Sequence, residues 1–242
     1  MKVHILYLII VSSIGLSSCS AQFGDLLNKA KKELKLEELS TADVAAGLKE
    51  ALSKGTSKGA DQLSIKDGFY RSIYKIVLPD EAKAVCDKLK FIPGFDRIEE
   101  TVLEKINRAA EDAAIKAKPI FLSAIRQMTF QDAWNILTGA ENAATLYLIK
   151  TTREALYDEF DPVITESLNK FGALDYWASA VNKYNKIPLV KPTNPDLADH
   201  VNNKALDGLF KMIENEEKEI RNNIASRTTD LLRRVFSRQD KK

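Results

Sequence analysis

Apolar residues recur at every third or fourth position along most of the chain, which is the spacing of helices that bury one face. The pattern is clearest after Arg97, where one predicted helix has the apolar positions Ile98, Val102, Ile106, Ala109, Ala113 and Ala117. A second long helix begins at Glu141 or Asn142, and its apolar positions are Leu146, Ile149, Leu156 and Phe160. Pro162 follows, and we expect it to kink or restart that helix. This periodicity predicts an all-α protein.

Residues that are typical of helix ends agree with the apolar pattern. Ser40 or Thr41 can cap one helix, and its apolar residues follow at four-residue spacing. Thr129 begins another helix, with Asp132 three residues later, a spacing at which each side chain can bond the other's backbone N–H. Gly139 follows this helix, and we expect it to adopt the left-handed conformation that ends many helices.

Two segments depart from the helical pattern. Residues 69–78 are rich in aromatic and β-branched side chains, which favours an extended or β segment before Pro79. Residues 186–196 contain three prolines and no helical period, so we expect a connecting loop. No repeat or change in composition divides the remainder. The prediction is therefore one multi-helix, bundle-like domain over residues 40–237, with one short extended or β segment near 69–78 and a charged tail at 238–242.

The N-terminal residues have the pattern of an export signal. Lys2 precedes an apolar run at residues 3–16, which is too short to span a bilayer comfortably and is followed at once by polar residues. The motif Leu16-Ser17-Ser18-Cys19 resembles a bacterial lipobox, which implies that residues 1–18 are a lipoprotein signal peptide and that Cys19 is lipidated. The alternative is an ordinary secretory signal that contains a cysteine. Residues 19–39 would then be a lipid tether followed by an exposed amphipathic segment.

This signal predicts a location and a first partner. Two or three acyl chains on Cys19 would attach the chain stably to a membrane. Ser20 follows the cysteine, and in enteric-type bacteria a residue other than aspartate at that position favours the outer membrane. We therefore expect a lipid-anchored protein of the bacterial cell envelope, on the outer membrane and facing the periplasm. Loss of Lys2 with the signal would leave a net charge of +1, so nucleic acid is not an expected partner.

Scarce cysteine and histidine restrict the chemistry further, because the whole chain has two of each. If Cys19 is lipidated, Cys86 has no cysteine with which to form an intrachain disulfide. The apolar helical face around Cys86 indicates a buried thiol, the alternative being a reactive one. His200 is then the only histidine of the mature chain, and a lone histidine is usually a satisfied helix residue. We expect no metal site and no cofactor.

Other motifs are open to a structural and a chemical interpretation. Residues 55–59 match the G-x-S-x-G pattern of hydrolases, but helical sequence precedes them instead of a buried strand, so we interpret the match as accidental. Carboxylates such as Glu111 and Asp132 could serve a hydrolase or could be solvated helix charges. Arg153 falls on the apolar seam of its predicted helix, where either its stem packs while its head reaches water, or it meets a buried acid.

Dispersed motifs along residues 40–237 resemble one bacterial envelope family. The matching residues are Asn107-Arg108-Ala109-Ala110-Glu111, Pro119-Ile120-Phe121, Met128-Thr129, Asp132-Ala133, Ile136-Leu137, Gly139, Ala144-Thr145, Tyr147, Phe160-Asp161-Pro162, Gly208-Leu209-Phe210, Glu217, Ile220-Arg221, Arg227-Thr228 and Val235-Phe236. The family is the one called domain of unknown function 4197. The resemblance implies a secreted or lipid-anchored protein and transfers no catalytic residue.

The polar residues within these motifs are the candidate site. We hypothesise that several of them converge on one polar groove between the helix at 97–117, the helix at 141–160 and the C-terminal pair of helices. The candidates are Asn107, Arg108, Glu111, Asp132, Thr145, Tyr147, Glu217, Arg221 and Arg227. Such a groove would suit a small polar ligand or a segment of an envelope protein. The alternative is that these residues cap helices and form interhelical ion pairs.

Three functions remain after these exclusions. The first, which the sequence favours, is a lipid-anchored envelope protein of unknown biochemical activity whose domain binds or scaffolds without catalysis. The second is an envelope hydrolase, which predicts two nearby carboxyl groups in a cleft, one of them with a pKa raised by burial. The third is a lipid-handling helical protein, which predicts an apolar cavity between helices.

Overall fold

A computed structural model describes residues 40–170, 172–192 and 197–237. The proposed signal peptide, Cys19, the tether and the charged tail at 238–242 lie outside the described residues. Residues 40–242 group into one compact unit. The described residues are all helices and connections, without a strand, which confirms the all-α prediction.

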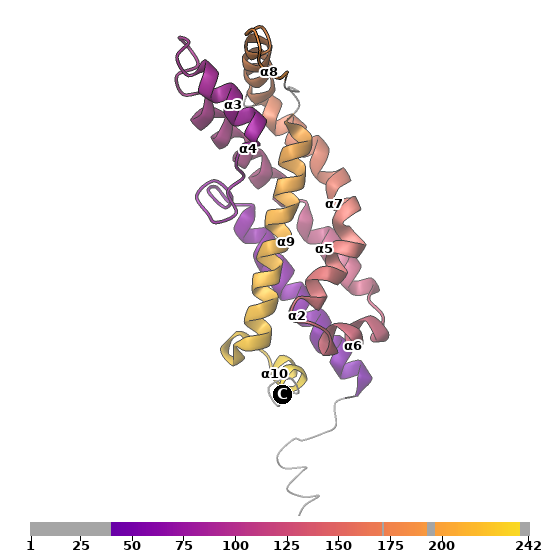
Figure 1. Cartoon of the computed structure of the whole chain (residues 1–242). Coiled ribbons are helices and arrows are strands. Elements are labelled where there is room, and N and C mark those ends of the chain that lie inside the picture. Colours follow the sequence, from indigo (N-terminus) through magenta and orange to yellow (C-terminus); the bar gives the residue numbers. More distant parts are fainter. Residues whose placement is uncertain (1–39, 171, 193–196, 238–242) are drawn as a thin grey trace, which may run out of the picture. The chain divides into compact units, whose positions relative to one another are not determined.

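Figure 1 labels the helices, and its colours follow the sequence. Their bounds are α2 Thr41–Leu63, α3 Asp80–Leu89, α4 Ile98–Ala114, α5 Ala117–Gln127, α6 Phe130–Thr138, α7 Ala143–Lys170, α8 Ala173–Tyr184, α9 Ala198–Asn222, the 3₁₀ turn η1 Ile224–Ser226, and α10 Asp230–Phe236.

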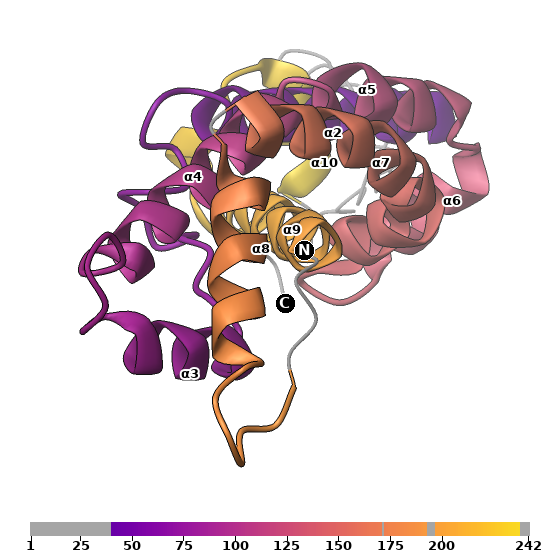
Figure 2. The same ribbon diagram turned by 90° about the horizontal axis from the view of Figure 1, so that it is seen from above.

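The long helices α7 and α9 form the centre of the unit and pack along one another. Helix α4 packs on α7, while α2 contacts α5, α6, α9 and α10. Figures 1 and 2 show α3 and α8 packed together beside the N-terminal end of α9, away from α6 and α10. The unit therefore has two ends, one formed by α3 and α8 and the other by α6, η1 and α10.

Small residues on α4 permit the close packing of the centre. Ala109, Ala110, Ala113 and Ala114 are fully buried, as the alanine-rich pattern indicates. On α7 the buried positions follow a four-residue spacing: Leu148, Thr152, Leu156, Phe160 and Ile164. The expected placement of Leu146 in this face is wrong, because Leu146 is exposed. The apolar pattern misplaced the first turn because Ala144 and Thr145 take the buried positions there.

Helix ends match the sequence signals at two of three positions. Ser40 and Asp43 form one reciprocal capping box, and Thr129 and Asp132 form another. Gly139 differs from expectation, because its backbone is extended and not left-handed. Space explains the glycine instead: a Cβ there would lie 2.7 Å from the carbonyl oxygen of Asn135. Helix α7 continues through Pro162 as one helix.

The G-x-S-x-G residues lie within α2 and not on a strand-to-helix turn. Gly55 faces Glu216 and Ile220 of α9, while Gly59 faces Met212 and Ile213 of the same helix. A Cβ at Gly59 would lie 3.1 Å from Met212 Cγ, so Gly59 lets α2 and α9 approach closely, whereas a Cβ at Gly55 would make only ordinary contacts. The interpretation of the motif as accidental agrees with this placement.

Residues 64–79 form a series of turns followed by irregular backbone at 75–79, with no strand. The aromatic and β-branched residues indicated an extended segment, but no neighbouring strand lies beside it among the described residues. Side chains of α4 form hydrogen bonds with its backbone instead, and these side chains are among the candidate site residues.

Candidate functional site

The nine candidate residues come together in two clusters, with two members apart from both. The α4 cluster consists of Asn107, Arg108 and Glu111. The α9 cluster consists of Thr145, Glu217, Arg221 and Arg227. Asp132 and Tyr147 lie at the start of α6 and the start of α7.

Glu111 of the α4 cluster holds the turn at the start of the 64–79 segment. Its Oε1 accepts hydrogen bonds from the backbone N–H groups of Phe69 (3.1 Å) and Tyr70 (3.0 Å). Arg108 donates to Glu111 Oε2 at 2.8 Å and to Asp67 at 2.8 Å. The hydrogen bond with Arg108 lowers the pKa of Asp67, so this carboxylate stays ionised. Both oxygens of the buried Glu111 are therefore bound within the chain.

Asn107 holds the end of the same segment. Its amide oxygen accepts from the N–H of Ile76 at 2.8 Å, and its amide nitrogen donates to the Ile76 carbonyl at 2.9 Å and the Leu103 carbonyl at 2.7 Å. The side chain thus replaces a neighbouring strand, because it satisfies both backbone groups of one residue. Ile76 is buried and outside regular structure, so its backbone groups need such partners.

Glu217 of the α9 cluster caps the N-terminus of α7. Oε1 accepts from the backbone N–H of Ala144 at 3.0 Å, and Oε2 accepts from the N–H and the hydroxyl of Thr145, both at 2.8 Å. A carboxylate is favourable there, because the first N–H groups of a helix have no partner within it and carry partial positive charge.

The two arginines of the α9 cluster bind the C-terminal ends of helices. Arg221 donates to Glu217 at 2.9 Å and to the carbonyl of Ile136 in α6 at 2.9 Å. Arg227 donates to the carbonyls of Ile220 (3.0 Å) and Arg221 (2.7 Å) at the end of α9. The cluster therefore joins the ends of α6, α7 and α9 through groups that are buried and mutually bound.

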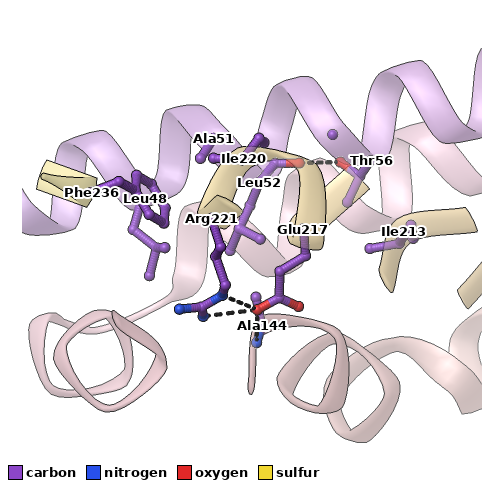
Figure 3. A pocket seen from close by; sticks show the side chains of 11 residues that line it. Leu48, Ala51, Leu52, Thr56, Ala144, Ile213, Glu217, Ile220, Arg221 and Phe236 are labelled. Atoms are coloured by element: carbon purple, nitrogen blue, oxygen red, sulfur yellow. Dashed lines mark hydrogen bonds and ion pairs between the residues drawn. The ribbon is translucent and has the colours of Figure 1, made fainter. Parts of the chain in front are cut away.

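A small cavity adjoins the ion pair of the α9 cluster. Figure 3 shows Glu217 and Arg221 at its edge, with Leu48 and Leu52 of α2 among the apolar residues of its wall. The cavity has about 20 Å³ of space for the centres of water molecules, which is room for about one water. Neither an acyl chain nor a small polar metabolite fits this space.

Asp132 and Tyr147 have different surroundings from the clusters. The hydroxyl and the backbone N–H of Thr129 donate to Asp132 and lower its pKa. Tyr147 lines a surface hollow between α5 and α7, where burial and the charge of Asp132 raise its pKa. A hydrolase that uses Asp132 as its acid needs a raised pKa at that residue, and the structure gives a lowered one.

The remaining sequence candidates occupy structural positions. Cys86 is a free, buried thiol whose pKa is raised by burial to about 12, so its reactive thiolate is disfavoured. His200 Nε2 lies 2.9 Å from the carbonyl oxygen of Val77. Arg153 reaches the half-exposed Asp207 of α9 at 3.0 Å, and not a buried acid.

Sequence reasoning missed the partner of the α4 cluster. Glu111 and Asn107 bind backbone groups some thirty to forty residues earlier, and backbone groups have no sequence signature. A signal was present in their spacing, because polar residues four apart interrupt an otherwise apolar and alanine-rich face of α4. Such residues are buried only where they have partners.

Two further properties of the described residues concern metal binding and membrane spans. Within residues 40–237 as described, no group of three histidine, cysteine or acidic side chains is arranged to hold a metal ion. None of the described helices has both the length and the apolar content needed to cross a bilayer.

Comparison with known proteins places the chain in one family. No curated protein and no solved structure matches it. The family model described as "Protein of unknown function (DUF4197)" matches residues 38–237, which include every described helix and both polar clusters. The chain therefore belongs to the DUF4197 family.

Proposed function

We propose that this protein is a lipid-anchored component of the bacterial cell envelope whose helical domain binds a partner without catalysis. The anchor is Cys19, the location is the outer membrane, and the domain faces the periplasm. The lipobox-like motif Leu16-Ser17-Ser18-Cys19 and the apolar run before it support the anchor. The twenty-one residues from Cys19 to Leu39 form the tether, long enough to span at most about 70 Å.

The use of the buried charges supports binding over catalysis. Glu111 and Glu217, the two buried carboxylates among the described residues, have both oxygens engaged by backbone N–H groups and an arginine. A general acid or base must reach a substrate atom within hydrogen-bond distance. The proposal of a non-catalytic domain rests on this observation. Glu111 binds the backbone of the 64–79 segment and Glu217 binds the first N–H groups of α7, so neither carboxylate is available to a substrate.

Membrane attachment is tested with Cys19→Ala and Cys19→Ser variants in a bacterial host. We expect the wild-type chain in the membrane fraction and both variants in the soluble envelope fraction or retained as unprocessed precursor. An inhibitor of the lipoprotein signal peptidase should cause the unprocessed wild-type form to accumulate. Membrane attachment of processed Cys19→Ala protein, from which the signal peptide has been removed, at the wild-type level would overturn the anchor.

Binding is tested by crosslinking in intact envelopes, followed by purification of the full chain. We expect one discrete adduct that is lost when the purified chain is unfolded before crosslinking. Hydrolysis of an envelope glycan or ester by the purified chain would contradict the proposal if the activity disappears in Asp132→Asn protein. A far-UV circular dichroism spectrum of that variant that matches the wild type at the assay temperature is the control for its fold.

A further inference from the structure

The connection between α8 and α9 presents an apolar tip to solvent. Residues 185–192 follow α8, and Ile187, Pro188, Leu189 and Val190 form the tip. Leu189 is fully exposed, while Ile187 and Val190 are partly exposed. In Figure 2 this connection projects from the C-terminal end of α8, away from the centre of the unit. An exposed leucine at the end of a projecting loop has no packing role in the described fold.

The backbone conformation of Leu189 makes the presence of a leucine at this position informative. Its φ is 66°, in the left-handed region that favours glycine and, less strongly, asparagine. A leucine there brings its Cβ close to the following carbonyl oxygen and gains no buried contact in return. Folding alone would favour glycine at this position. A strained residue whose side chain has no internal contact indicates a contact outside the chain.

Lysines surround the tip. Lys186 precedes it and Lys191 follows it, both are exposed, and no acidic residue lies between Lys183 and Pro192. Neither Lys186 nor Lys191 has an ion-pair partner among the described residues. An apolar tip with a collar of unpaired lysines matches a bilayer that contains anionic lipids, because the tip can enter the acyl boundary while the ammonium groups meet the headgroups.

Helix α8, from which this loop starts, is packed on its neighbours. Trp177 and Tyr184 of α8 are buried. Tyr176 stacks on Phe95 with ring centroids 5.5 Å apart, and Lys183 lies 4.4 Å from the centroid of the same Phe95 ring. The loop therefore begins from a helix anchored on both faces, so little ordering is needed when the tip meets a surface.

We propose that residues 185–192 are a membrane-contact loop that inserts Leu189 into the surface of a bilayer containing anionic lipids. Lys186 and Lys191 supply the electrostatic attraction, and Leu189 supplies the apolar insertion. The inference does not rest on lipidation of Cys19, because the tip, its strain and its lysines are properties of the folded domain. With an anchor present, the loop would be a second attachment that orients the domain.

The test places a tryptophan at the tip of the full-length chain reconstituted into vesicles. The background is Trp134→Phe, which leaves the buried Trp177 as an internal reference. Leu189→Trp is compared with Ile224→Trp, since Ile224 is also exposed and lies at the opposite end of α9. The vesicles contain phosphatidylglycerol and lipids brominated on their acyl chains. We expect a blue shift and loss of emission for the tryptophan at 189, and neither for the one at 224.

Further variants separate this proposal from a structural role. Lys186→Gln and Lys191→Gln should each lower the vesicle affinity, obtained from the lipid dependence of the quenching at position 189, about five-fold. Neutral vesicles should lower this affinity as well. Leu189→Gly should raise the unfolding temperature, because glycine adopts the left-handed conformation without strain, and it should abolish insertion into the bilayer. If the leucine had a structural role, this substitution would lower the unfolding temperature. Equal quenching at 189 and 224, or no quenching at 189 in anionic vesicles, would overturn the proposal. Crosslinking of position 189 to an envelope protein and not to lipid would also overturn the proposal.

Discussion

At the scale of single residues, charge inside this domain serves to close helix ends. Glu217 occupies the N-terminus of α7, and Arg221 occupies the C-terminus of α6. The side chains of both residues are only 5% exposed, so each charge depends on the other for compensation. Removing one partner of such a pair leaves an uncompensated buried charge, which costs far more than the loss of a surface ion pair.

We therefore expect Glu217→Gln to lower the free energy of unfolding by about 3 kcal/mol, measured by urea denaturation. The control is Glu214→Gln, three residues earlier on the same helix. Glu214 pairs with Lys211 and Lys218 near the surface, so its loss should cost less than about 1 kcal/mol. Equal effects of the two substitutions would show that the α9 cluster does not depend on its buried charge.

A second residue-scale prediction concerns pH. The hydrogen bonds from Thr129 lower the pKa of Asp132 below 3.8, so the ionised carboxylate stabilises the folded state. This contribution is fully present above pH 3.8 and disappears as the pH falls through the lower, folded-state pKa. Asp132→Asn should therefore destabilise the protein at neutral pH, by about 1 kcal/mol for a helix cap. The difference from wild type should shrink in thermal melts below pH 3, and a constant difference would be contrary to this assignment.

At the scale of elements, the sequence predicts helices better than it predicts what joins them. Capping residues such as Ser40 and Thr129 act within one turn, so local sequence specifies those helix starts. The prediction placed Leu146 on the buried face, although it is exposed. Apolar periodicity does not determine which edge of the apolar face of a helix packs against a neighbouring helix. Residues 69–78 were expected to be extended because their side chains suit a strand. Their conformation depends on Glu111 and Asn107, whose partners are distant in sequence.

The glycines of α2 offer a test of element packing. A Cβ at Gly47 would lie 2.7 Å from Val235 Cγ2 of α10, whereas one at Gly55 would lie 3.6 Å from the Cβ of Glu216. Gly47→Ala should therefore destabilise the protein through the clash. Gly55→Ala should stabilise it by up to about 1 kcal/mol, because alanine is the better helix former. Thermal unfolding of both variants measures this, and destabilisation by Gly55→Ala would contradict the packing described for α2.

At the scale of the whole molecule, the sequence predicted a helical domain over residues 40–237, and the family match covers 38–237. The structure groups seven of the nine candidate residues around two sets of backbone groups, and Asp132 and Tyr147 lie apart from both sets. Spacing along the chain could not reveal this, because Glu217 and Thr145 are 72 residues apart. The described residues form a helical domain whose buried polar groups are bound within the chain, and we propose that Cys19 attaches this domain to a membrane.

The mass of the mature N-terminus tests this account most directly. The chain is purified from the membrane fraction of its bacterial host and digested with trypsin, and the peptide ending at Lys29 is analysed by mass spectrometry. The account predicts that this peptide begins at Cys19 and has a diacylglyceryl group on the thiol with an acyl group on the amine. Mild alkali should remove the two ester-linked acyl chains and leave the amide-linked one. A peptide that begins at another residue, or an unmodified Cys19 in membrane-attached protein, would contradict it.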